Sequence, residues 1–164
     1  MVNAIYKDSE GFVWLGTDNC LDRFDGVKVR HFEFRGIESG RKKRVNTITE
    51  TANKQLWVGN GIGLWRLNRA SGQLERIVPE KIDFAVNTLL SDGDILYIGT
   101  DRGVWLLVGN TFFPLQGADA LASKRIRGII PYKKGVLVVT AYNGLYYCDG
   151  RTMEPFITGA EEFM

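Results

Sequence analysis

A four-residue pattern returns along the chain at intervals of about forty residues. It stands as Trp14-Leu15-Gly16-Thr17, Trp57-Val58-Gly59-Asn60, Tyr97-Ile98-Gly99-Thr100 and, faintly, Val138-Val139-Thr140-Ala141. The first three glycines are 43 and 40 residues apart, and Thr140 follows Gly99 by 41 residues. A fixed period of this length indicates a repeat protein, so we interpret the 164 residues as four copies of one structural unit.

Each unit contains four short β-prone segments separated by turn residues. The first segments are 2–5, 45–48, 86–89 and 126–129, and the second are 12–16, 55–59, 95–99 and 136–140. The third are 21–25, 64–68, 104–108 and 145–149, and the last are 27–32, 73–77, 111–115 and 153–157. Gly, Asn and Asp between the segments tolerate the positive φ of tight hairpins, so each unit is predicted to be a four-stranded antiparallel meander.

The predicted strands are apolar on both faces, which indicates that each sheet packs against another sheet on either side. Four-stranded sheets stacked in this way are the blades of a β-propeller. We therefore expect an all-β fold in which blades 1 to 4 span 1–44, 45–85, 86–125 and 126–164 and together form one partial propeller domain. The alternative is a β-sandwich or barrel with accidental internal similarity.

Composition excludes several other classes. Hydrophobic residues make up 45% and charged residues 24% of the chain, as in globular proteins. The formal charge is +2 and the basic residues are scattered, apart from the run from Arg41 to Arg44, so we expect no nucleic-acid binding. That run is interpreted as a solvated loop rather than a phosphate site. The longest apolar runs are strand-sized, so no direct membrane contact is expected.

The recurring aromatic residues are predicted to be core residues rather than sugar-stacking platforms, because each group keeps a fixed register in the repeat. One group comprises Trp14, Trp57 and Tyr97, and the other Trp65, Trp105 and Tyr146. Met1 stands directly before the first repeat, so we expect the chain to be a piece of a longer protein, with any signal peptide outside it.

No catalytic or metal-binding constellation is apparent from neighbouring residues. His31 is the only histidine, and local sequence supplies it with no partners for a triad or a metal. Cys20 stands where other units have a turn glycine, so we expect it to be strained and partly exposed. Cys148 aligns with apolar residues and is predicted to be buried. The interpretation is a non-enzymatic chain that needs no cofactor and no metal.

Polar residues between the second and third strands are the candidate ligand contacts. They occupy equivalent ends of successive blades, so a ring would bring them together on one face. The candidates are Asp18, Asn19, Asn60, Asp101, Arg102, Tyr142 and Asn143. The alternative for each of them is an ordinary solvated turn.

The pattern Asp-x-x-Gly-x-x-Trp-Leu-Gly-Thr, followed by Leu-x-Arg-Phe-Asp, resembles the two-component regulator propeller repeat. Unit 1 carries it from Asp8 to Thr17 and from Leu21 to Asp25, and units 2 and 3 keep much of it. Unit 4 keeps mainly Asn143-Gly144-Leu145-Tyr146. The resemblance implies four blades of a larger, often seven-bladed, periplasmic propeller in front of a membrane-anchored histidine kinase of the Bacteroidetes type.

What the resemblance implies for function is a non-catalytic sensing module that responds to glycan fragments, with an oligosaccharide ligand and the rest of a sensor kinase as partners. Two alternatives remain open. One is part of a lyase-type propeller enzyme with its catalytic residues outside this segment, and the other is a protein-interaction scaffold. Because an open set of four blades would expose apolar end faces, we also expect self-association through the terminal blades.

Overall fold

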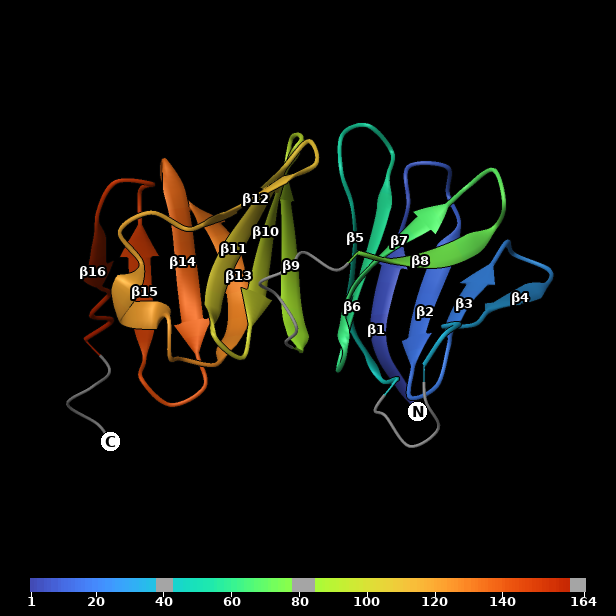
Figure 1. Ribbon diagram of the computed structural model, residues 1–164, viewed down its shortest axis with the longest axis horizontal. Coiled ribbons are helices and arrows are strands. Elements are labelled where there is room, and N and C mark those ends of the chain that lie inside the picture. The colour runs from blue at the N-terminus through green and yellow to red at the C-terminus, as the bar shows by residue number, and fades with distance from the viewer. Residues whose placement is uncertain (38–42, 78–84, 160–164) are drawn as a thin grey trace.

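The computed structural model, which describes residues 1–37, 43–77 and 85–159, contains four separate four-stranded antiparallel sheets (Figure 1). Blade 1 consists of β1 (Val2–Lys7), β2 (Val13–Thr17), β3 (Leu21–Phe24) and β4 (Val29–Phe32), and blade 2 of β5 (Val45–Glu50), β6 (Leu56–Asn60), β7 (Gly63–Asn68) and β8 (Gln73–Ile77). Blade 3 consists of β9 (Val86–Asp92), β10 (Ile95–Thr100), β11 (Gly103–Val108) and β12 (Thr111–Pro114). Blade 4 consists of β13 (Ile126–Tyr132), β14 (Gly135–Thr140), β15 (Leu145–Cys148) and β16 (Met153–Pro155). The predicted four-stranded meanders are confirmed, because every sheet pairs its strands in chain order.

The four sheets stand side by side in an open array. The first strands of the blades are neighbours across the sheets, since β1 contacts β5, β5 contacts β9 and β9 contacts β13. Blades 1 and 4 lie at opposite ends of the molecule (Figure 1). Three buried apolar clusters fill the spaces between blades 1 and 2, blades 2 and 3, and blades 3 and 4. The core therefore lies between sheets, as two-faced apolar strands require.

The repeated glycine is where one blade touches the next. A Cβ atom on Gly16 would collide with the side chain of Val45 in blade 2, and one on Gly59 with Val86 in blade 3. On Gly99 it would lie 2.8 Å from Cγ2 of Ile126 in blade 4. The glycine is retained because the first residue of the following blade packs directly on its backbone.

The repeated tryptophan is buried and hydrogen-bonded. Trp14 is fully buried, and its Nε1 donates to Asp8 Oδ2 at 2.8 Å. The Asp8 Oδ1 atom also accepts from the backbone N–H groups of Glu10 and Phe12, so one carboxylate holds both the turn and the indole. In blade 2, Trp57 Nε1 donates to Thr51 Oγ1 at 3.2 Å. The prediction that the recurring rings belong to the core is confirmed for Trp14, Trp57 and Trp65, which are buried. The other three are partly buried and pack against the clusters, namely Tyr97, Trp105 and Tyr146.

Blade 4 departs from the sequence alignment by one residue. Gly16 pairs with Ala4, Gly59 with Thr47 and Gly99 with Thr88, whereas the corresponding pair in blade 4 is Val139 with Gly128. The structural counterpart of the repeat is thus Leu137-Val138-Val139-Thr140, which corrects the match to residues 138–141. In blade 4 the glycine of this pair is Gly128 on β13, opposite Val139 on β14.

The turn before the third strand needs a glycine in three blades. Gly63, Gly103 and Gly144 have φ values of 135°, 87° and 78°, as expected from their positions. Cys20, their counterpart in blade 1, is not among the residues with positive φ, so the expectation of strain was wrong. Its exposure is intermediate, as expected. Cys148 is buried, which confirms its assignment to the core.

One element between blades 3 and 4 was not predicted. The short 3-10 helix η1 (Asp119–Leu121) places the fully buried Leu121 in the cluster between those blades. The backbone of Leu121 lies 3.1 Å from the position that a Cβ on Gly103 would take. The connection therefore contributes to the core instead of crossing the surface.

Arg69 links blades 1 and 2 at the end of the sheets opposite to the candidate loops. Its guanidinium contacts Glu10 at 2.7 Å and Glu50 at 3.0 Å. Glu50 also accepts hydrogen bonds from the backbone N–H and hydroxyl of Ser9 in blade 1. The Glu50 side chain is only 6% exposed, whereas those of Arg69 and Glu10 are 32% and 43% exposed, so this network links the two blades at the surface through one buried carboxylate.

The two terminal blades have apolar residues on their outer faces. Ile5 is 71% exposed, although Ile48, Leu89 and Ile129 at the same register are all buried against a preceding blade. At the other end, Ile130 is half exposed beside the ring contacts that join Tyr132 to Tyr147 and Phe156. Both end sheets therefore present surface that an internal blade buries.

Candidate functional site

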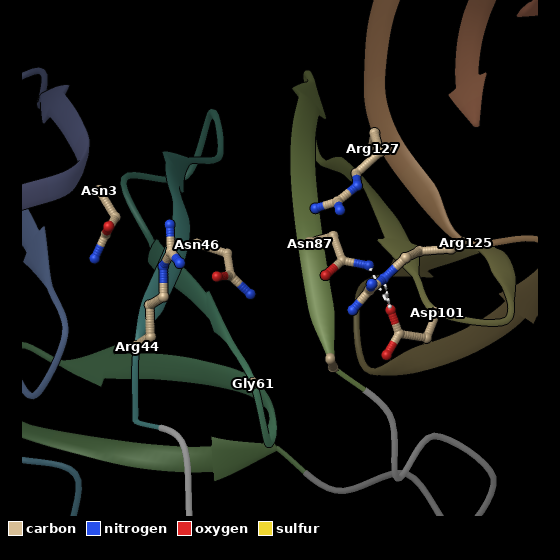
Figure 2. A pocket seen from close by; sticks show the side chains of 9 residues that line it. Asn3, Arg44, Asn46, Gly61, Asn87, Asp101, Arg125 and Arg127 are labelled. Carbon is tan, nitrogen blue, oxygen red and sulfur yellow. Dashed lines mark hydrogen bonds and ion pairs between the residues drawn. The ribbon is translucent and has the colours of Figure 1, made fainter. Parts of the chain in front are cut away.

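A polar pocket of about 530 Å³ opens beside the first strands of the blades (Figure 2). It draws residues from blades 1 to 4 and from the segments before them, namely Asn3, Arg44, Asn46, Gly61, Ala85, Asn87, Asp101, Arg125 and Arg127. In Figure 2, Arg44 and Asn46 face Asn87, Arg125 and Arg127 across the opening. The pocket is thus a property of the array, since no single blade supplies it.

Four of the lining residues occupy one repeat position. Asn3, Asn46 and Asn87 are the second residues of β1, β5 and β9, and Arg127 is the second residue of β13. The apolar residue before each of Asn46, Asn87 and Arg127 is fully buried against the previous blade. Because side chains alternate along a strand, the next residue points away from that interface and toward the pocket.

Asp101 is held in place by two donors. The amide Nδ2 of Asn87 donates to Asp101 Oδ1 at 2.9 Å, and Nε of Arg125 donates to the same oxygen at 2.7 Å (Figure 2). The carboxylate thus joins blade 3 to the start of blade 4 across the floor of the pocket. A positioned and partly neutralised carboxylate of this kind orients the arginine beside it.

Blade 1 repeats the same arrangement with Asn3 and Asp18. The Asn3 Nδ2 atom donates to Asp18 Oδ1 at 2.9 Å, and this hydrogen bond, followed by that from the N-terminal ammonium, lowers the pKa of the Asp18 carboxyl. Arg44 lowers it further by its charge, so Arg44 lies within electrostatic reach. Blade 2 has no aspartate in this loop, and Asn46 donates instead to the carbonyl of Val86 at 2.9 Å.

The pocket has an excess of positive charge. Arg44, Arg125 and Arg127 line it together with one carboxylate, Asp101, which already pairs with Arg125. Within the described part of the chain, the guanidinium of Arg127 has no hydrogen-bond or ion-pair partner (Figure 2). Guanidinium groups and amide N–H groups that converge in a partly enclosed space favour an anionic ligand.

The sequence-predicted contacts differ in where they lie relative to the pocket. Asp101 lines the pocket, and Asp18 reaches its rim through Asn3. Asn19, Arg102, Tyr142 and Asn143 are not among the lining residues, and Tyr142 is 86% exposed.

The side chain of Asn60 is fully buried, which differs from the loop position at the ligand face that was expected for it. Its Oδ1 accepts from the backbone N–H of Ile62 at 3.0 Å and from Trp65 Nε1 at 3.1 Å. The equivalent residue in the other blades is Thr17, Thr100 or Thr140, whose hydroxyl donates to a carbonyl of the same turn. Asn60 therefore closes a turn through its Oδ1 atom, while its buried Nδ2 atom has no hydrogen-bond partner among the described residues.

Sequence reasoning missed the asparagines and arginines of the pocket. The recurring Val-Asn at the start of three units was interpreted only as the beginning of a strand. In units 2 and 3 the valine is buried, and the asparagine beside it therefore points to the opposite side of the strand. Arg44 belongs to the basic run interpreted as a solvated loop, and it lines the pocket instead. Arg41 and Lys42 lie outside the described residues.

None of the described helical segments has the length and apolar character needed to cross a membrane. Three residues of blade 1 with metal-ligand side chains lie within 4.8 Å of one another and do not line the pocket, namely Cys20, Asp22 and His31.

Comparison with known proteins supports the architecture. The family model described as two component regulator propeller matches residues 1–19. The extracellular domain of a putative hybrid two-component system from B. thetaiotaomicron superposes with a TM-score of 0.77 at 22% identity, over 95% of this chain and 22% of that chain. A second such domain from the same organism gives a TM-score of 0.74 at 19% identity, over 96% and 24%.

A lyase also shares the fold. Virginiamycin B lyase from Staphylococcus aureus superposes with a TM-score of 0.70 at 17% identity, over 96% of this chain and 57% of the lyase chain. No curated protein sequence matches the chain. The structural neighbours establish a β-propeller fold, and the chain spans less than a quarter of the two extracellular domains.

Proposed function

We propose that this chain is a non-catalytic ligand-binding module of a two-component sensor, exposed to the periplasm, and that its ligand is an acidic oligosaccharide fragment. The match of residues 1–19 to the two component regulator propeller and the likeness to extracellular domains of hybrid two-component systems support the sensor role. The observation that carries the ligand proposal is the set of three arginines around one carboxylate in the pocket.

The pocket groups suit a saccharide that carries carboxylate or sulfate groups. Arginine presents a rigid fork of N–H donors that matches such groups, and no described residue pairs with the guanidinium of Arg127. Asn3, Asn46 and Asn87 add amide groups that both donate to and accept from sugar hydroxyls. No aromatic ring is among the lining residues described, so recognition rests on charge and hydrogen bonds rather than stacking.

The test is calorimetric titration of the purified chain with two oligosaccharides of equal length, one of uronic acids and one of neutral sugars. We expect the acidic one to bind and to raise the melting temperature, and the neutral one to have no effect. The substitution Arg127→Gln should weaken binding by about 10-fold or more, because a hydrogen bond to a charged group contributes ~1.5–3 kcal/mol.

Arg151→Gln is the matched control, since Arg151 is exposed and lies outside the pocket. It should bind as the unmodified chain does. Equal binding of both sugars, or no effect of Arg127→Gln, would contradict the proposed ligand class. Turnover of the sugar would favour the lyase-type alternative, although His31 lies in β4 and not in the pocket. Inertness toward every saccharide would favour a protein-interaction scaffold.

We also propose that two copies associate through their terminal blades. Ile5 is 71% exposed where the equivalent residues of the other blades are buried, so a second copy that covers this face would bury the same kind of surface. Sedimentation at increasing concentration should show a monomer–dimer shift. The substitution Ile5→Glu should abolish it, whereas Val27→Glu, in an exposed hairpin turn, should not. A monomer at all concentrations would refute the proposed association.

A further inference from the structure

Three side chains with metal-ligand chemistry meet on the outer face of blade 1. Cys20 precedes β3, Asp22 lies within β3, and His31 lies in β4. Asp22 and His31 are direct partners in the antiparallel pairing, and Cys20 is two residues before Asp22, so all three point to one side of the sheet. One ligand atom from each residue lies within 4.8 Å of the other two.

The distances are close to those of a metal-bound set. His31 Nδ1 is 2.6 Å and Cys20 Sγ is 3.2 Å from the same Asp22 Oδ1 atom. In a tetrahedral zinc site with Zn–S of about 2.3 Å and Zn–N or Zn–O of about 2.0 Å, pairs of ligand atoms lie roughly 3.3–3.6 Å apart. Small side-chain rotations would therefore open a space of the right size between the three atoms.

The surroundings favour a cation that binds a thiolate. The Asp22 carboxylate lies 3.2 Å from the Cys20 sulfur and places a negative charge beside it. That charge attracts a divalent cation, which displaces the thiol proton when the sulfur binds it. The Thr17 hydroxyl lies 3.3 Å from Cys20 Sγ and helps to fix the direction of the sulfur.

We propose that Cys20, Asp22 and His31 form a three-ligand site for a borderline-soft divalent cation of the zinc type, with solvent in the fourth position. Sulfur, imidazole nitrogen and carboxylate oxygen are the donors that zinc takes in proteins, and three protein ligands leave one position open. Entry is direct, because the His31 side chain is 69% exposed while the Asp22 side chain is only 14% exposed.

The test uses the untagged, reduced chain, titrated with Zn²⁺ by calorimetry and with Co²⁺ by absorption spectroscopy. We expect one equivalent to bind and the cobalt form to show thiolate-to-metal charge-transfer absorption. Cys20→Ser should remove that absorption and weaken zinc binding by at least about 10-fold, since even the loss of outer partners of a metal site costs 10–100-fold. His31→Gln should weaken binding similarly.

Cys148→Ala is the matched control, because Cys148 is the other cysteine and is buried between blades 3 and 4. It should keep both the affinity and the charge-transfer absorption. Circular dichroism should show that all three variants are folded. Absence of binding to the unmodified chain, or binding that survives both Cys20→Ser and His31→Gln, would overturn the proposal.

Discussion

Replacing Trp14 by alanine should lower the free energy of unfolding by about 3–5 kcal/mol, the usual cost of removing a buried large aromatic side chain. Trp14 is fully buried, and its ring lies 5.3 Å from that of Phe32 between blades 1 and 2. Urea unfolding followed by circular dichroism measures the change from the shift of the midpoint.

Trp14→Phe tests how much the indole N–H contributes to stability, apart from the contribution of the buried ring. It keeps an aromatic ring but removes the donor to Asp8 Oδ2, so a buried carboxylate loses a hydrogen bond. We expect a loss of about 1–3 kcal/mol for this variant. If Trp14→Ala cost less than about 1 kcal/mol, the interface between blades 1 and 2 would not be packed as described.

Replacing Gly59 by alanine should lower the free energy of unfolding by about 1–3 kcal/mol, although only one methyl group is added. That methyl would overlap the Val86 side chain and would lie 2.7 Å from Cγ2 of Thr47. The first strand of blade 3 would have to move away from blade 2, which disturbs the apolar cluster between them.

Gly128→Ala is the matched control for this substitution. A Cβ at Gly128 meets Cγ2 of Val139 at 3.4 Å, which is ordinary contact, and Gly128 is not in the left-handed region. Because alanine restricts the unfolded chain more than glycine does, we expect no loss of stability or a gain of up to about 1 kcal/mol. Equal losses at both positions would show that the close approach at Gly59 is unimportant.

The fold was predictable because the repeat gives four independent estimates of the same element. In blade 2 the predicted last strand, 73–77, is the observed β8 (Gln73–Ile77), and most other boundaries differ by one or two residues. Blade 4 was misaligned because Val139 replaces the glycine that anchors the comparison. The helix η1 was missed because its apolar residues, such as Leu121, lie outside the repeat.

The candidate sites were less predictable because they depend on side chains that different strands bring together. Asp101 was identified from its loop, but its partners Asn87 and Arg125 come from the first strand of its own blade and the start of the next. The pairing of His31 with Asp22 can be found only from the register of the β3–β4 hairpin. Counting outward from the turn at Asp25 and Lys28 pairs Asp22 with His31, so the sequence did contain that signal.

Blade 4 has Val139 at the position of the repeat glycine and Gly128 opposite it on the neighbouring strand. Its outer face therefore differs from the corresponding faces of blades 1 to 3. At each internal interface, the first residue of one blade packs against a glycine of the blade before it, in the space that a Cβ atom would otherwise fill. The outer face of blade 4 carries the Val139 side chain at that point and offers its smallest residue one strand away, at Gly128. A sheet added there cannot repeat the internal contact and must settle in a displaced position. Blade 4 is therefore not interchangeable with the other three, because at an internal position it would lack the glycine against which the first residue of the next blade packs.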